Sequence, residues 1–444
     1  MRRSLVAIAL STGLLACACG NGEAAPSSKA EATTVVAVRP ESPLDAAKRL
    51  ALQPPGSSTA VDTLVANLQR AAERDPARGN LWVVLGRAWV RKARETTDPG
   101  FYLNAKAASD VALDVDANDP TALDLQGLVL LNDHRFEEAR ALAQRIVDVH
   151  PVDPIGYGTL SDALLELGRF DEAAAAAQTM MDLKPNLPSY SRASYLRWLQ
   201  GDVEGAKQAV RLAIDSGADQ RDPEPRAWVL VQAAMIFWHE GDVEGAEAGF
   251  DAALAQMTSY PPALVGKARV ALARRQGSEA AQLLRRAYDG SPLVETAWLL
   301  GDALAMSGDT AGANDAYARV VKTGKQSDPR TLALFWATRN EHTAEALALA
   351  EGEKKVRGDI TTDDTYAWTL YRSGRLSDAR VAIDRALTHH TRDARLLYHA
   401  GAIRIALGEG REGRALVGRA LALAPHFDET GADEARRLMG DAPR

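Results

Sequence analysis

A short motif that returns after 34 residues is the strongest constraint on the fold of this chain. Phe136-Glu137-Glu138-Ala139 recurs as Phe170-Asp171-Glu172-Ala173, and prolines at positions 151 and 185 stand the same distance apart. The hexapeptide GDVEGA occurs at residues 201–206 and again at 241–246. A period of this length is typical of a stack of supersecondary units, in which each unit contacts only its neighbours.

Each unit has the composition of two helices joined by a turn. Aromatic residues make up only 6% of the chain, alanine and leucine are frequent, and β-branched residues stand singly, which favours helix over strand. Small residues such as Ala173 and Ala246 recur where the two helices of a unit would cross closely. Glycine, which adopts positive φ after a helix end, recurs at the expected turns: Gly168, Gly201, Gly241, Gly308, Gly374 and Gly408. The sequence therefore predicts an all-α protein.

This pattern resembles the tetratricopeptide repeat family. Ten units can be placed, starting near residues 79, 120, 154, 187, 227, 261, 294, 327, 360 and 394, and they cover residues 79–427. A half-repeat at residues 60–78 precedes them as an N-terminal cap, and residues 428–444 form a capping helix and tail. The resemblance implies an α-solenoid of about ten helix-turn-helix units. The unit at residues 327–359 lacks the turn glycine, so we expect the solenoid to kink or break there.

The first 16 residues have the features of a signal peptide. Two arginines at positions 2–3 precede an apolar stretch at residues 5–16, which is too short to span a bilayer as a helix. Leu14-Leu15-Ala16-Cys17 resembles the lipobox of bacterial lipoproteins, and that resemblance implies cleavage before Cys17 and lipidation of its sulfur. Cys19 is an alternative acylation site, and an ordinary secretory signal cut near Ala25 is a second alternative.

Residues 17–59 are rich in Ala, Ser, Pro and Glu, which predicts a flexible tether with a short helix near residues 44–52. If Cys17 carries lipid, the protein is anchored to a membrane of the bacterial cell envelope, on its periplasmic or extracellular face. No later stretch reaches 18 apolar residues.

Composition argues against several functional classes. The net charge of -7 and the absence of a dense Lys/Arg cluster argue against a nucleic-acid partner. Both cysteines lie in the first 20 residues, so no disulfide or cysteine-ligated metal is expected in the body. The G-x-G-x-x-G match at residues 408–413 follows a predicted helix instead of the strand that a dinucleotide site requires. His389 and His390 are adjacent, so on a helix they face different directions. We expect no catalytic site, no cofactor and no metal.

The resemblance to tetratricopeptide proteins also implies where a partner binds. In that family the first helices line a concave groove, and five positions of each unit are exposed in it. These positions here hold many aromatic residues, which often anchor protein interfaces. Two arginines beside them could take a carboxylate. The predicted groove residues are Tyr195, Trp198, Trp228, Met235, Trp238, His239, Trp298, Phe335, Arg339, Trp368, Tyr371, Arg372 and Tyr398. The alternative is that these rings pack between adjacent first helices and only shape the superhelix.

The sequence thus predicts a non-catalytic, membrane-tethered scaffold or adaptor that binds a protein or peptide partner in its groove, in the assembly of the cell envelope. The alternative is a glycan-contacting accessory, or an enzyme with a scattered site. Asn and Gln, which a sugar site needs beside its rings, are scarce in this chain. The polar C-terminal helix argues against end-to-end stacking, so we expect a monomer.

Overall fold

The computed structural model describes residues 41–56, 59–217 and 222–440. These residues form 23 α-helices and, within the described ranges, no strand, so the prediction of an all-α solenoid is confirmed. The helices lie in one compact unit, Ser42–Arg444. The signal peptide, both cysteines and most of the predicted tether lie outside the described residues. In the part of the chain that the structure describes, none of the helices combines the length and apolarity needed to span a bilayer.

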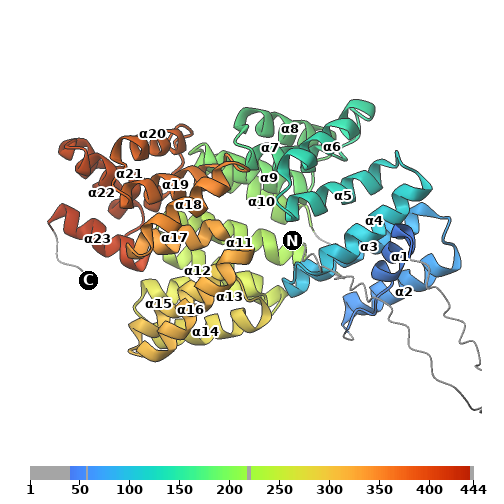
Figure 1. Ribbon diagram of the computed structural model, residues 1–444, viewed down its shortest axis with the longest axis horizontal. Helices are drawn as coiled ribbons and strands as arrows, with labels where there is room; N and C mark the ends of the chain where they lie inside the picture. The colour runs from blue at the N-terminus through green and yellow to red at the C-terminus, as the bar shows by residue number, and fades with distance from the viewer. Residues whose placement is uncertain (1–40, 57–58, 218–221, 441–444) are drawn as a thin grey trace, which may run out of the picture. The chain divides into compact units, whose positions relative to one another are not determined.

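Ten consecutive helix pairs make up α3–α22 (Figure 1). The first helices of the pairs are α3 (Gly79–Thr96), α5 (Pro120–Asn132), α7 (Tyr157–Glu166), α9 (Leu187–Leu199), α11 (Glu224–His239), α13 (Pro261–Ala273), α15 (Val294–Met306), α17 (Pro329–Arg339), α19 (Ile360–Arg372) and α21 (Ala394–Ala406). The second helices are α4 (Phe101–Val115), α6 (Phe136–Val149), α8 (Phe170–Leu183), α10 (Val203–Asp215), α12 (Val243–Gln256), α14 (Gly277–Gly290), α16 (Thr310–Ser327), α18 (Thr343–Lys354), α20 (Leu376–Ala386) and α22 (Gly410–Leu423). The pairs are preceded by α1 (Pro43–Ala51) and α2 (Ala60–Arg74) and followed by α23 (Glu429–Met439).

The N-terminal cap begins earlier than the sequence predicted. We expected a tether up to residue 59 with a short helix near residues 44–52. The helix is present as α1, but it packs against α4, and its Ala51 is fully buried. The indole Nε1 of Trp89 and the amide Nε2 of Gln69 donate hydrogen bonds to the Ala51 carbonyl at 3.0 and 3.2 Å. The first helix pair has no preceding repeat to cover it, so α1 takes that place by burying small apolar residues.

The stack does not break at residues 327–359, where the sequence predicted a kink or break. Helices α17 and α18 contact each other, and both contact α19, so the stack continues through this pair. Asn340 and His342 adopt left-handed conformations, with φ of 55° and 46°, in the turn where other pairs carry glycine. Asparagine and histidine enter this region more readily than most residues, so the turn forms without glycine.

The solenoid coils far enough for its later pairs to contact its earlier ones. We call α3–α14 the first coil, α15–α23 the second coil, and the contacts between them the seam. At the seam, turns within the pairs of the first coil meet loops that precede or follow pairs of the second coil. The Gly358 N–H, just before α19, donates to the Glu166 carbonyl at 2.8 Å, and Thr391, just before α21, donates to the Leu199 carbonyl. In Figure 1 the green helices α7–α10 accordingly lie beside the orange α18–α20.

The turn glycines of the first coil make the seam possible. Gly168, Gly201 and Gly241 all have φ near +77°, and a Cβ on each would lie 2.2 to 2.6 Å from a carbonyl oxygen of the second coil. The matching glycines of the second coil, Gly308 and Gly374, have open space at that position. Glycine is therefore needed at these turns of the first coil for two reasons: the backbone conformation and the close approach of another chain segment.

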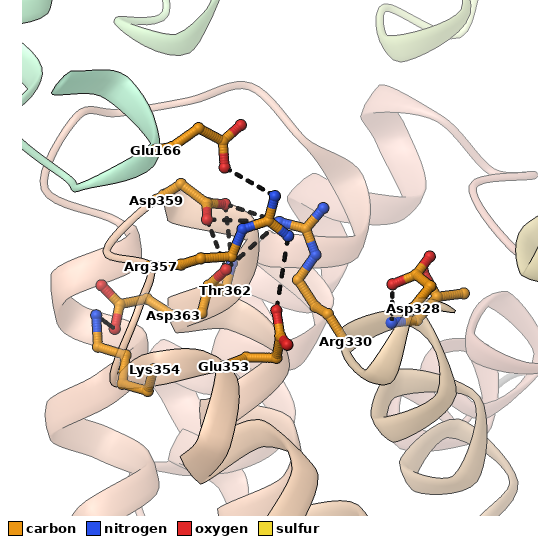
Figure 2. A network of polar contacts seen from close by, with 10 residues as sticks. Glu166, Asp328, Arg330, Glu353, Lys354, Arg357, Asp359, Thr362 and Asp363 are labelled. Atoms are coloured by element: carbon orange, nitrogen blue, oxygen red, sulfur yellow. Dashed lines mark hydrogen bonds and ion pairs between the residues drawn. The ribbon is translucent and has the colours of Figure 1, made fainter. Parts of the chain in front are cut away.

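Polar side chains from both coils contact each other at the seam (Figure 2). The Arg357 guanidinium lies 3.0 Å from the carboxylate of Glu166 in α7 and 3.7 Å from that of Glu353 in α18. Arg330 lies 3.3 Å from Asp359. Burial raises the pKa of Glu166, while the charge of Arg357 opposes that rise. The pair therefore joins the two coils at a partly desolvated position, where losing one partner is costly.

Replacing a seam glycine should destabilise the protein more than the same change outside the seam. Gly168→Ala and Gly374→Ala both place a side chain at φ near +77°, which costs about 1–2 kcal/mol. Only Gly168→Ala also forces a Cβ against the Gly358 carbonyl, and we expect about 1–3 kcal/mol more from that crowding. Urea unfolding of the two variants measures the difference. Equal losses would show that contact between the coils does not contribute to stability.

Candidate binding site

A cavity of about 370 Å³ lies between the two coils. Helices α9, α11 and α13 form one side, and the N-terminal ends of α19 and α21 with the segment after α22 form the other. Its volume is within the range of ligand pockets, roughly 300–1,000 Å³. The residues that line it are Ser191, Ser194, Tyr195, Trp198, Gln232, Met235, Ile236, Trp238, His239, Arg269, Glu295, Thr361, Asp393, Ala394, Arg395, Ala424 and Phe427.

Aromatic rings form the wall contributed by the first coil. Tyr195 and Trp198 stack with their centroids 6.0 Å apart and their planes 17° from parallel. The ring of His239 lies 4.5 Å from that of Trp198. The indole Nε1 of Trp198 is buried and has no hydrogen-bond partner among the described residues. This wall therefore offers mainly apolar contact, since the unpaired indole nitrogen is itself covered by protein.

Polar pairs join the wall of the first coil to that of the second. His239 Nδ1 lies 3.2 Å from the Asp393 carboxylate, and Arg269 lies 2.5 Å from Glu295. Asp393 also caps α21 by accepting a hydrogen bond from the Leu396 N–H at 2.9 Å. Burial alone would raise the pKa of Asp393. The hydrogen bond and charge of His239 outweigh this effect and hold that pKa well below its usual range. The contact between His239 and Asp393 joins the first coil to the second across the cavity.

Tyr195 is the aromatic residue that opens most fully onto this space. Its relative exposure is 44%, yet the surrounding protein raises the pKa of its phenol to about 12. The two values are compatible because protein surrounds much of the phenol even though one side of the residue opens on the cavity. A second cavity of about 420 Å³, lined by the seam residues around Arg330 and Gly358, shares Tyr195 and Thr361 with the first.

The structure brings together five of the predicted groove residues. Tyr195, Trp198, Met235, Trp238 and His239 all line the first cavity. Trp228 is 38% exposed, but it lies outside this cavity. The members that belong to later units, from Trp298 to Tyr398, do not line it either.

Four of the predicted groove residues are buried, so the expectation that they are exposed is wrong. Their exposures are 7% for Trp238, 2% for Phe335, 0% for Trp368 and 1% for Tyr398. Trp368, for example, stacks on Tyr371 at 4.8 Å and on His399 at 4.0 Å. The reason is that neighbouring first helices, and in the last pairs α23, cover these rings. For them the alternative holds, since they pack between helices.

Half-buried residues account for the remaining predicted positions. Trp298 meets the edge of Phe335 at 5.3 Å. Arg339, expected to take a carboxylate of a partner, pairs with Glu341 at 3.2 Å and lies over the ring of Tyr317 at 4.4 Å. Arg372 pairs with Glu434 of α23 at 2.6 Å. Both arginines therefore already have carboxylate partners in this chain.

The sequence analysis did not predict which residues form the opposite wall of the cavity. Thr361, Asp393, Arg395 and Phe427 come from the second coil, far along the chain from Tyr195. A repeat register places residues on a face of one unit, but it does not say which distant unit that face meets. Among the described residues, no group of three or more His, Cys, Asp or Glu side chains is arranged to hold a metal ion.

A partly buried acid lies near Arg339. The Tyr317 hydroxyl donates to the Asp302 carboxylate at 2.8 Å. Burial raises the pKa of Asp302 to about 7, and the hydrogen bond from Tyr317 opposes the rise. The folded pKa thus lies above the unfolded value of about 3.9. The unfolded chain therefore releases this proton at a lower pH than the folded protein, and stability falls as pH rises from about 4 to about 7.

Replacing Asp302 with asparagine should remove the loss of stability that this carboxyl group causes as the pH rises. We expect the melting temperature of Asp302→Asn, relative to that of the parent protein, to rise between pH 4.5 and pH 8, because asparagine carries no ionisable proton. Thermal melts at several pH values measure this difference. Melting temperatures that change in parallel would contradict the assignment of this proton to Asp302.

Comparison with known proteins identifies the repeat. A family model described as tetratricopeptide repeat matches residues 125–188 and 265–329. A search of curated protein sequences returned no match. Similar solved structures include a human IFIT1 dimer with PPP-AAAA, at 14% identity and a TM-score of 0.47, covering 86% of this chain and 94% of that one.

Two further similar structures are shorter. PilF from Pseudomonas aeruginosa has 16% identity and a TM-score of 0.39, covering 47% of this chain and 93% of that one. PilW, a type IV pilus biogenesis factor, has 14% identity and a TM-score of 0.40, covering 48% and 96%. The matched repeats and the ten helix pairs together show that this chain is an all-α solenoid containing tetratricopeptide repeats, an architecture that in general serves as a scaffold for protein interactions.

Proposed function

We propose that this protein is a non-catalytic adaptor that binds a segment of a protein partner in the cavity between its two coils. The observation that carries the proposal is the grouping of Tyr195, Trp198 and Met235 around this cavity. Aromatic side chains in water-excluding pockets are the usual anchors of protein interfaces. A cavity of about 370 Å³ admits a side chain or a short segment and not a folded domain.

The polar groups of the cavity favour a segment that can accept hydrogen bonds. The Arg395 guanidinium makes no hydrogen bond among the described residues, and its Nε lies 3.9 Å from the Asp364 carboxylate. Carbonyl or carboxylate oxygens of a peptide would satisfy such donors, which otherwise cost free energy when buried.

The geometry does not favour the glycan alternative. A sugar stacks on a free aromatic face, whereas the ring of Trp198 is stacked against Tyr195 and also contacts His239. Trp238 is only 7% exposed. The two tryptophans of this wall therefore offer edges and partial faces, which suit apolar side chains better than a pyranose.

Truncating Tyr195 should weaken binding of the partner without unfolding the protein. Loss of an interface anchor costs about 2 kcal/mol or more, which is about thirtyfold in affinity. Trp228→Ala is the matched control, because Trp228 is an exposed aromatic of the same region that lies outside the cavity. Affinity for the partner recovered with the intact chain is measured for both variants, with circular dichroism as the check on folding. Binding that survives Tyr195→Ala and is lost in Trp228→Ala would place the partner on the outer surface.

We also propose that lipid on Cys17 tethers the adaptor to a membrane of the bacterial cell envelope, where it serves envelope assembly as a monomer. The support is the signal-like segment at residues 1–16, the lipobox resemblance that ends at Cys17, and the tether that follows it. Several acyl chains on one cysteine anchor a protein stably, whereas a single chain gives marginal binding.

Replacing both cysteines with serine should release the protein from membranes. Cys17→Ser alone should have the same effect if Cys17 is the lipidated residue, whereas Cys19→Ser alone should leave the protein in the membrane fraction. Fractionation of cells that express each variant measures the distribution. A doubly substituted protein that stays with the membranes would refute the lipid anchor.

A further inference from the structure

The seam joins helix pairs that are six apart in the chain. The turn of the third pair, at Gly168, meets the loop before the ninth pair at Gly358, and the turn of the fourth pair, at Gly201, meets the loop before the tenth pair at His390. The turn of the fifth pair meets the end of α22 in the same way. Because the offset is constant, the turns of the first coil form one edge that faces one edge of loops on the second coil.

The apolar cores of the molecule run along the chain and not across the seam. Each buried apolar cluster is made by helices of neighbouring pairs, as expected for a stack of repeats. In the part of the chain that the structure describes, the cluster around Phe170 is the one that takes in a side chain from across the seam, that of Ile360. Phe170 also stacks on His389, with ring centroids 4.2 Å apart. Few apolar contacts therefore have to break for the coils to separate.

Polar contacts make up much of the rest of the seam, and water can replace them. The Glu240 carboxylate accepts two hydrogen bonds from Arg392, at 2.9 and 3.0 Å, and the Arg392 side chain is 50% exposed. Exposed pairs contribute little to stability. Burial raises the pKa of Glu166 against the charge of Arg357, so the closed seam stabilises this carboxylate less well than water does. Removing one partner leaves the other desolvated, whereas separation of the coils hydrates both.

The helix pairs on either side of the seam keep their own contacts without it. Helices α7 and α8 contact each other and the adjoining α6 and α9, and α19 contacts α18, α20 and α21. The backbone hydrogen bond from the Gly358 N–H to the Glu166 carbonyl, at 2.8 Å, instead crosses the seam. Separation of the coils breaks this bond and leaves the hydrogen bonds within the helices intact.

We propose that the seam is a latch: the two coils separate along it and close again as two units, while every helix pair keeps its fold. The movement needs small rotations between successive pairs, of the kind that packed helices make by sliding over one another. Both cavities have walls from the two coils, so separation opens them and closure encloses what has entered. A segment that contacts both walls shifts the equilibrium toward the closed form. This regulation rests on the proposed binding in the cavity, whereas the latch itself does not.

Hydrogen exchange at the Gly358 amide measures how often the latch opens. In Gly201→Ala, the added Cβ would lie 2.6 Å from the His390 carbonyl oxygen, one pair away from Gly358. If the seam opens as a unit, this crowding should speed exchange at Gly358 by about tenfold or more, while amides inside α7 and α19 stay protected. Gly374→Ala is the matched control and should leave this exchange unchanged, because Gly374 has a φ of 76° but open space at the Cβ position.

Energy transfer between two dyes measures the distance between the coils independently. Leu212→Cys in α10 and Val381→Cys in α20 replace exposed side chains of opposite coils. The same chain carries Cys17→Ser and Cys19→Ser, so that the dyes attach only at these two positions. Transfer should become less efficient when Gly201→Ala is added, because the coils then spend more time apart.

Arg392→Glu opens the latch without straining the backbone, and it replaces Gly201→Ala if that variant fails to fold. The change places two acids together at Glu240, so exchange at Gly358 should rise and energy transfer should fall. Arg411→Glu is the control for the change in charge, because Arg411 is exposed and lies beside the open turn at Gly408. It should change neither measurement.

The latch is supported if exchange at Gly358 and the distance between the dyes rise together while the helices stay protected. It is overturned if Gly358 keeps its protection in a folded seam variant, because the contacts along the seam then break one by one. It is equally overturned if α7 or α19 loses protection together with Gly358, because the pairs then unfold instead of separating. No partner enters these measurements, so their failure would leave the Tyr195 test of the cavity function unaffected.

Discussion

The close approach between the two coils is the constraint on which the rest of this structure depends. The turns at Gly168, Gly201 and Gly241 pass within Cβ contact of carbonyl oxygens that belong to later pairs, and no side chain larger than hydrogen fits there. Because these turns are repeated at the same place in successive pairs, the contact is repeated along the seam. The two coils thereby form two cavities, and each cavity has walls from both coils.

This arrangement changes what a repeat protein of this kind can present to a partner. An open superhelix exposes the same positions of every unit, whereas here the position of a unit along the coil decides its environment. Tyr195 opens on a cavity, while Trp368 and Tyr398, at comparable groove positions of later units, are covered by neighbouring helices and the C-terminal segment. Aromatic residues at equivalent positions of the repeat thus have different environments. The contacts of the second coil decide which of them line a cavity and which pack between helices.

Charged residues are likewise divided between contacts that join the two coils and contacts within the second coil. The pair of His239 and Asp393 and the pair of Arg357 and Glu166 each join one coil to the other, so they stabilise the seam while lining or bordering the cavities. Arg372 instead binds a carboxylate of α23. Partly buried pairs of this kind are costly to break because a single charge is left desolvated.

The sequence by itself determined the repeat, the helix pairs and their turns, because each depends on residues within about 34 positions of one another. The resemblance to tetratricopeptide proteins also placed Tyr195, Trp198, Met235 and His239 on one face, because the repeat register assigns equivalent positions of each unit to the groove. The sequence could not show that this face meets Asp393 and Phe427, or that Arg372 is already paired with Glu434. Those contacts depend on the rotation between successive pairs, which accumulates along the stack. Small differences in packing between pairs decide whether distant coils touch, so only the tertiary structure fixes them.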